Sequence, residues 1–318
     1  MMSRRLQAMA ALIVIQGTQH ALAGEQFYEV NDTVRIGGGV GYTFINSDEI
    51  VYDGAGNRIS HLFWGSQAPV VSGAIEAEFA NGWTLRAGGA FAAAGNSHME
   101  DYDWLDPYFV SYDFDDWTHR SVHPETRLAH YFSGDVAVGR DLPLGTAATL
   151  NLHAGLKYTD VKWNAYGGSF VYSITGYRAD TFSVPDGTPG ISFQQRYPGI
   201  FLGASLAAQH GPWSFSGQAR GGVSIRATDT DHHWARDLRF EERYGATPFV
   251  TAAARVDYAF NDRAGVFLSG DFQQYFHAIG DSTMYDIPTG DQLEPTSTEG
   301  AGMTLRAISV SAGFRMKF

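Results

Sequence analysis

The feature that most constrains the fold is a regular alternation of short and long connections between strand-like runs. Short turns rich in Gly, Pro, Asn and Asp fall at residues 80–82, 141–145, 210–212 and 261–263. Longer polar connections lie between them, near residues 53–57, 96–123, 167–189, 229–239 and 281–302. The runs predict ten strands, at residues 33–52, 58–80, 83–95, 124–140, 146–166, 190–209, 213–228, 240–260, 264–280 and 303–318. An even number of strands with such links is typical of an antiparallel up-and-down transmembrane β-barrel, with both chain ends on the periplasmic side.

Composition also favours strands over helices. The 318 residues include 37 Gly, 21 Phe, 16 Tyr and 7 Trp, which suits many strands and tight turns. No apolar run reaches the ~20 residues that a spanning helix needs. Many predicted strands exceed the ~10 residues that cross the apolar layer, so we expect an all-β barrel that extends above the outer membrane. The absence of Cys fits passage through an oxidising compartment.

The N-terminus predicts export. Arg4-Arg5 precede an apolar stretch at residues 8–15 and small residues at 21–23, the pattern of a signal peptide cleaved after Ala23. We therefore expect a signal peptide at residues 1–23 and one barrel domain at residues 24–318. Removing two Arg and no acid changes the formal charge from −12 to −14, which argues against a nucleic-acid partner and favours cationic ones.

The C-terminus predicts a barrel strand. Ile308, Val310, Ala312, Phe314, Met316 and Phe318 alternate with mostly polar or small residues. A last strand ending in Phe is typical of the outer-membrane assembly signal, although a soluble sandwich also contains such amphipathic strands.

Two short acidic motifs carry the candidate chemistry. In an extended strand, side chains two residues apart share a face, so Asp229, Asp231 and His233 point one way, and Asp101 and Asp103 share a face of their strand. Together they could hold a water molecule, with His233 as general base and Asp231 orienting its ring. Adjacent histidines point to opposite faces, so only one of the 232–233 pair can join the cluster, and no metal is predicted. The alternative interpretation is a set of solvated loop side chains.

The residues around these motifs identify a family. Asp101-Tyr102-Asp103-Trp104, Trp117-Thr118, Ser121-Val122-His123-Pro124 and Asp229–His233 resemble the omptins, outer-membrane aspartyl proteases of Gram-negative bacteria, in the same order from about Glu49 to Phe318. The resemblance implies an endopeptidase in the bacterial outer membrane with its active site on the extracellular side. Asp103 and His233 would bracket the water, Asp231 would support His233, and Asp101 would support Asp103.

The same resemblance suggests specificity. Glu49 and Asp229 match acids that bind a basic P1 side chain, so cleavage of peptides and proteins after Arg or Lys is expected. Two acids in one site discriminate against neutral side chains because bound cation relieves their repulsion. His119 stands where omptins often carry an acid on the P1′ side, which weakens the expectation of a basic P1′ residue. Ser121 has no base assigned and is interpreted as a loop serine.

A further cluster suggests a lipid partner. Tyr158, Asp160 and Lys162 alternate onto one face, and together with Arg196 they resemble the omptin lipopolysaccharide site, with Lys where Arg is usual. We therefore expect lipopolysaccharide as an activator and no other cofactor. The alternative is a simple cross-strand ion pair.

Two other functions fit the same architecture. A non-catalytic adhesin would use the outer loops only for binding. A narrow pore is less favoured, because ten strands leave an interior that side chains largely fill.

Overall fold

The computed structural model describes residues 33–318, so the predicted signal peptide at residues 1–23 lies outside the described residues. Thirteen strand segments make up a single sheet. The segments are β1 (Thr33–Tyr52), β2 (Arg58–Glu78), β3 (Trp83–Ala92), β4 (Asn96–Asp103), β5 (His119–Leu144), β6 (Ala148–Tyr172), β7 (Asp180–His210), β8 (Trp213–Ile225), β9 (Thr228–His233), β10 (Leu238–Tyr244), β11 (Ala246–Ala259), β12 (Ala264–Asp286) and β13 (Ser297–Lys317). Three single 3₁₀ turns accompany them, η1 (Ala80–Gly82), η2 (Phe114–Asp116) and η3 (Trp234–Arg236). No helix in residues 33–318 has the length and apolar character to cross a membrane.

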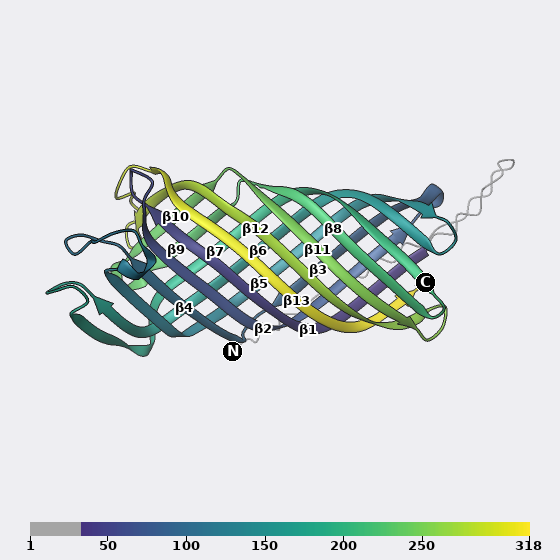
Figure 1. Ribbon diagram of the computed structural model, residues 1–318, viewed down its shortest axis with the longest axis horizontal. Helices are drawn as coiled ribbons and strands as arrows, with labels where there is room; N and C mark the ends of the chain where they lie inside the picture. The colour runs from purple at the N-terminus through teal and green to yellow at the C-terminus, as the bar shows by residue number, and fades with distance from the viewer. Residues whose placement is uncertain (1–32) are drawn as a thin grey trace, which may run out of the picture. The chain divides into compact units, whose positions relative to one another are not determined.

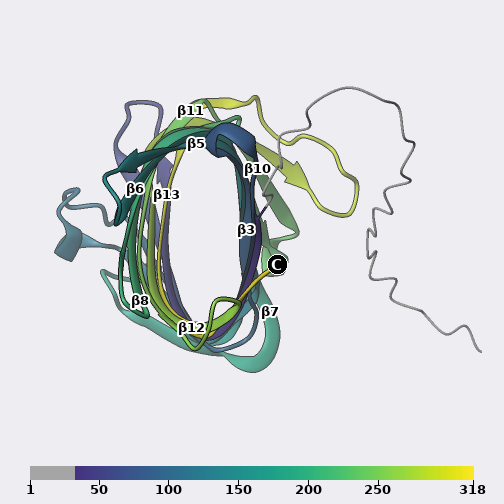
Figure 2. The same cartoon turned by 90° about the vertical axis from the view of Figure 1, so that its right-hand side faces the viewer.

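The sheet closes into a ring of ten strands, as predicted (Figure 2). Three of the ten positions are interrupted strands, in which β3 is continued by β4, β8 by β9, and β11 by β10. Two of the interruptions contain left-handed residues, Ala94 with Gly95 and Arg226. Around the ring the order is β1, β2, β3/β4, β5, β6, β7, β8/β9, β11/β10, β12 and β13, and all pairs are antiparallel. The all-β, ten-stranded up-and-down barrel is therefore confirmed.

Several predicted long connections are wrong in extent, because strands continue through them. The connection at residues 53–57 is as predicted, but the other four shorten to residues 104–118, 173–179, 234–237 and 287–296. The run from Asp229 to His233 lacks apolar alternation and was expected in a connection, yet β9 pairs with both β7 and β10. Hydrogen bonds on both sides satisfy its backbone, so polar side chains can stand on a strand there. The catalytic candidates are thus held by sheet rather than by loops.

An apolar band covers part of the outer wall. On β1 it includes Ile36, Val40, Tyr42 and Phe44, all large apolar side chains that are more than two-fifths exposed. By strand register, exposed aromatic side chains stand at the strand ends near the C-terminus, namely Trp83, Trp213, Tyr258, Phe260 and Phe318. Such a band flanked by aromatics suits an apolar layer with polar boundaries. Glu49 lies five residues beyond Phe44, so the candidate site stands clear of this band.

Side chains fill the inside of the ring at two levels. Arg220 pairs with Asp135 at 2.9 Å, and both side chains are largely buried. Nearer the candidate site, Trp64 and Trp163 stack on Phe193 with ring centroids 5.5 and 6.4 Å away. Side chains of this size occupy interior space, as expected for a ring of ten strands, and this favours a filled interior over a pore.

Candidate functional site

The first half of the site is the end of β4. Asp101 and Asp103 share one face, as alternation predicted, and both are half-buried. Ser60 on β2 is the Cα partner of Asp103, and its hydroxyl donates to Oδ1 of Asp101 at 3.1 Å. Burial and the neighbouring carboxylate raise the pKa of Asp101 well above its usual value. Burial likewise raises the pKa of Asp103, to about 6, so the pair holds a proton near neutral pH.

The second half of the site is β9. The carboxylate of Asp231 and Nε2 of His233 are 2.5 Å apart, and their side chains are 2% and 15% exposed. His232 points to the opposite face and stacks on Trp234 at 4.9 Å, so the predicted division of the two histidines is confirmed. Asp231 therefore binds one ring nitrogen of His233 and leaves Nδ1 as the other.

The two halves face one another at one end of the barrel. β4, β9 and β10 lie at the end opposite the C-terminus (Figure 1). Around the ring, β5, β6 and β7 separate β4 from β9. The two halves nevertheless act on each other across the gap, because the carboxylate of Asp231 raises the pKa of Asp101. The predicted four-residue constellation is therefore brought together.

A cation missed by the sequence analysis lies in this gap. Arg236, on the turn η3, donates from Nη2 to Nδ1 of His233. Its charge also acts on Asp101 and Asp103 and lowers their pKa values. Trp234 fixes the turn by donating its indole N–H to the hydroxyl of Ser192 on β7 at 2.8 Å. The sequence does not predict a role for Arg236, because the direction of its side chain depends on the geometry of this turn.

Three buried acids form a second cluster beside the catalytic candidates. Glu49 and Asp229, both predicted to bind substrate, are 3% and 1% exposed. They are joined by Glu242 on β10, which is 4% exposed and was not predicted. Burial raises the pKa values of all three. Repulsion adds to this effect, from Glu242 at both Glu49 and Asp229 and from Asp231 at Glu242, and the pKa values of Glu49 and Asp229 rise well above the usual range. Within residues 33–318 none of the three has a Lys, Arg or His partner at salt-bridge distance.

The remaining predicted substrate residue, His119, lies beside the aspartate pair. It is the Cα partner of Asp103, its Nδ1 is 2.9 Å from the hydroxyl of Thr118, and its ring contacts Tyr172 edge-on at 4.7 Å. Burial lowers the pKa of His119, so its imidazole is neutral at neutral pH.

Ser121 was interpreted as a loop serine without a base, and this is wrong. Ser121 stands on β5, and its hydroxyl is 3.0 Å from Nε2 of His123. The two residues are 3% and 2% exposed. Such burial hinders approach of a peptide carbonyl, so the pair suits a structural hydrogen bond better than a nucleophile.

The predicted lipid cluster is also assembled, on the outer wall. Asp160 accepts from the hydroxyl of Tyr158 at 3.3 Å and lies 3.8 Å from Nε of Arg196. His130, which the sequence analysis missed, places Nε2 2.9 Å from Asp160 and is the Cα partner of Lys162. The basic side chains of His130 and Arg196 thus contact one carboxylate, and Lys162 stands two residues from it on the same strand, β6.

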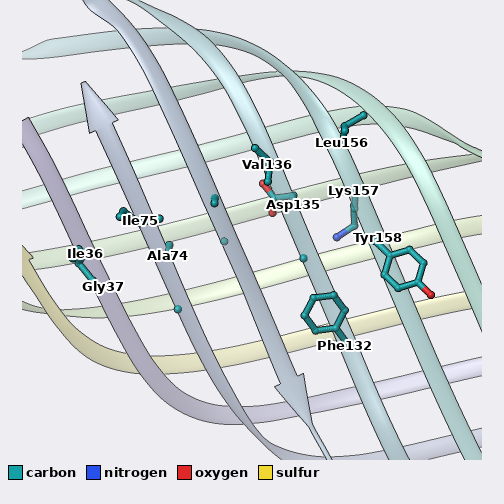
Figure 3. Close-up of a pocket in the computed structure, with 14 residues that line it drawn as sticks. Ile36, Gly37, Ala74, Ile75, Phe132, Asp135, Val136, Leu156, Lys157 and Tyr158 are labelled. Carbon is teal, nitrogen blue, oxygen red and sulfur yellow. The ribbon is translucent and has the colours of Figure 1, made fainter. Parts of the chain in front are cut away.

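A hollow in the wall adjoins this cluster (Figure 3). Its volume is about 680 Å³, and Tyr158 is one of the residues that line it. Exposed apolar side chains also line it, among them Ile36, Ile75, Val136 and Leu156. The hollow belongs to the apolar band and is separate from the acidic site.

Comparisons with known proteins agree with this architecture. The model of the Omptin family matches residues 30–318. Plasminogen activator from Yersinia pestis is 27% identical over 313 residues, which cover 96% of this chain and 97% of that protein. Outer membrane protease OmpP from Escherichia coli (strain K12) is 27% identical over 327 residues, 100% of each chain. The crystal structure of outer membrane protease OmpT from Escherichia coli has a TM-score of 0.82 at 23% identity and covers 92% of this chain and 99% of its own, which supports the fold.

Proposed function

This chain belongs to the omptin family, and from that premise we propose that it is an outer-membrane endopeptidase that cleaves peptides and proteins after Arg or Lys. The observation that carries the proposal is the Asp231–His233 contact of 2.5 Å facing the Asp101/Asp103 pair at one end of the barrel. The relatives named as proteases supply the reaction class. By analogy with outer-membrane barrels, the site faces the extracellular side, where the longer connections lie.

The nucleophile is a water molecule held between Asp103 and His233. Nδ1 of His233 accepts a proton from this water as its oxygen attacks the peptide carbonyl carbon. Asp231 holds the ring and stabilises the imidazolium that forms. The proton shared by Asp101 and Asp103 is available to the carbonyl oxygen, where negative charge develops.

Arg236 must leave Nδ1 before this chemistry can occur, because the nitrogen that receives the proton is engaged in the free protein. Arg236 is exposed and stands on a short turn, so its side chain can move at little cost. A peptide that carries a cation into the acidic site competes with Arg236 for attraction to the carboxylates there.

The acidic cluster supplies the preference for a basic P1 side chain. Glu49 and Asp229 are buried acids without a salt-bridge partner in the described chain, and an arriving Arg or Lys relieves their repulsion. Neutral side chains offer no such compensation. Neutral His119 adds no carboxylate on the P1′ side, so a non-basic P1′ residue is tolerated.

Lipopolysaccharide is the proposed activator. Lys162, Arg196 and His130 around Asp160 offer donors to lipid phosphates, and the adjoining apolar hollow offers contact for acyl chains. Binding there would brace β5, β6 and β7, the strands between the two halves of the site.

The test is cleavage of a mixed peptide pool by purified, lipopolysaccharide-reconstituted protein, read by mass spectrometry. We expect products ending in Arg or Lys from wild type, and a loss of ~10²–10⁴ in rate for His233→Ala. Ser121→Ala is the matched control and should retain activity. A near wild-type rate for His233→Ala, or loss with Ser121→Ala alone, would refute water activation. An adhesin without catalysis would yield no products from any variant.

A further inference from the structure

Glu242 and Asp229 form a buried carboxyl pair. They are Cα partners on β10 and β9, with 4% and 1% exposure. The hydroxyl of Tyr244 donates to Oδ2 of Asp229 at 2.7 Å and lies 3.3 Å from Oε2 of Glu242. Ser282 donates to Oε1 of Glu242 at 3.1 Å. The remaining oxygen, Oδ1 of Asp229, is buried and has no hydrogen-bond partner.

Every ionisable group that acts on this pair is acidic or phenolic. From β1 comes Glu49, whose Oε2 accepts from the indole of Trp64 at 3.1 Å. The other groups are Asp231 on β9, Tyr244 on β10 and Tyr197 on β7. Two buried carboxylates in contact, with no cation to compensate them, cannot both remain ionised, so a proton must lie between them.

We propose that Glu242 is a third carboxylate of the P1 site, and that it shares with Asp229 a proton that is released when an arginine side chain enters. This inference rests on the proposed function. In the empty site, protonated Asp229 donates to ionised Glu242. When the guanidinium arrives, the proton leaves to solvent, and the two carboxylates together with Glu49 surround the cation.

The arrangement favours arginine over lysine. A guanidinium presents five N–H donors in a plane and can bind two carboxylates side by side, whereas an ammonium is a compact point charge. The unpartnered Oδ1 of Asp229 is an acceptor ready for such a donor. Within residues 33–318 no three His, Asp or Glu side chains are placed to hold a metal ion, so an organic cation is the ligand that suits these acids.

The first test compares two peptides that differ only by Arg or Lys at P1. We expect Glu242→Gln to lower kcat/KM for the Arg peptide by about 10- to 100-fold and to lower it less for the Lys peptide. Glu241→Gln is the matched control, because Glu241 is the adjacent acid on β10 and pairs instead with Arg239 at 3.0 Å. Glu242→Asp keeps the carboxylate and should recover part of the loss. Folding of each variant is checked by its heat-modifiable band on a gel.

The second test measures proton release directly. The full-length His233→Ala protein, which is expected to cleave too slowly to matter during a titration, is titrated calorimetrically with the Arg peptide at pH 7 in two buffers of different ionisation enthalpy. We expect protons to be released as the peptide binds, and about one proton fewer per peptide after the further change Glu242→Gln.

The outcomes separate the two proposals. If wild type cleaves after Arg but Glu242→Gln behaves like Glu241→Gln, or if the number of protons released is unchanged by Glu242→Gln, the role of Glu242 is refuted and the protease assignment stands. If wild type does not cleave after basic residues at all, the proposed function itself fails.

Discussion

Replacing Asp103 by Asn should inactivate the protein and at the same time stabilise it. Burial raises the pKa of Asp103 from 3.8 to about 6, so the folded protein binds this proton more tightly than the unfolded chain does. Ionising Asp103 therefore costs folding free energy. The cost is absent below pH 4, grows between pH 4 and 6, and is complete above pH 6. Asparagine never ionises, and it removes the cost.

The size of the effect follows from the pKa difference. The two values differ by 2.2, from 6 − 3.8, and each pKa unit corresponds to 1.36 kcal/mol, which gives at most about 3 kcal/mol. Water reaches the half-buried side chain, and the proton is partly held by Asp101, so we expect a gain of about 1–2 kcal/mol at pH 8. The same substitution should lower kcat by ~10²–10⁴.

The assay is urea unfolding in lipid vesicles, followed by tryptophan fluorescence at pH 4 and pH 8. Asp48→Asn is a control of opposite sign, because hydrogen bonds from His61 and Thr304 lower the pKa of Asp48 and its carboxylate stabilises the fold above pH 4. Equal stability of Asp103→Asn and wild type at pH 8, or a gain that does not change with pH, would refute the reasoning.

Three further predictions concern the groups around the reaction. Arg236→Ala should raise kcat/KM on the order of tenfold, since it frees Nδ1 of His233 from a charged hydrogen bond, and a fall in steady-state rate would instead give the guanidinium a helpful role. At neutral pH and above, wild type should accept non-basic P1′ residues, because burial lowers the pKa of His119 and leaves its imidazole neutral, whereas His119→Asp should prefer basic ones; equal strictness of the two proteins in peptide profiling contradicts this. Protein refolded without lipopolysaccharide should be poorly active and recover on its addition, and Lys162→Ala with Arg196→Ala should blunt that recovery; equal rates with and without the lipid reject it.

Much of the fold was predictable because barrel strands obey a simple alternation. The ring of ten and the short turns follow from the spacing of turn residues along the chain. The shared faces of Asp101 with Asp103 and of Asp231 with His233 follow from the period of two in a strand. The predicted strands were too short at the end of the barrel opposite the C-terminus. At that end polar residues face both the interior and the outside of the barrel. The alternation of apolar and polar residues that predicts a strand within the apolar band is therefore absent.

That error also concealed Glu242. In the structure η3 turns over only four residues, 234–237, so His233 pairs with Leu238 and Asp229 pairs with Glu242. Both pairs sum to 471, as an antiparallel hairpin without a bulge requires. The predicted connection at residues 229–239 does not include the pairing of β9 with β10, so it gives Glu242 no partner. A turn placed at residues 234–237 predicts that Glu242 is the partner of Asp229.

Buried carboxylates in the candidate site and in the barrel interior have opposite effects on stability. In the interior, Asp135 neutralises Arg220 at 2.9 Å, so removing either charge leaves the other buried and unpaired, which commonly costs 3–5 kcal/mol. At the mouth, neither Asp101 nor Asp103 has a basic partner at salt-bridge distance within residues 33–318, and burial raises the pKa values of both. Amide substitutions should therefore stabilise the barrel and abolish function at Asp103, but destabilise it and leave the activity of the folded fraction intact at Asp135. The change in stability thus has opposite signs for two aspartates on neighbouring strands, β4 and β5. This difference distinguishes residues that stabilise the barrel from residues of the candidate site.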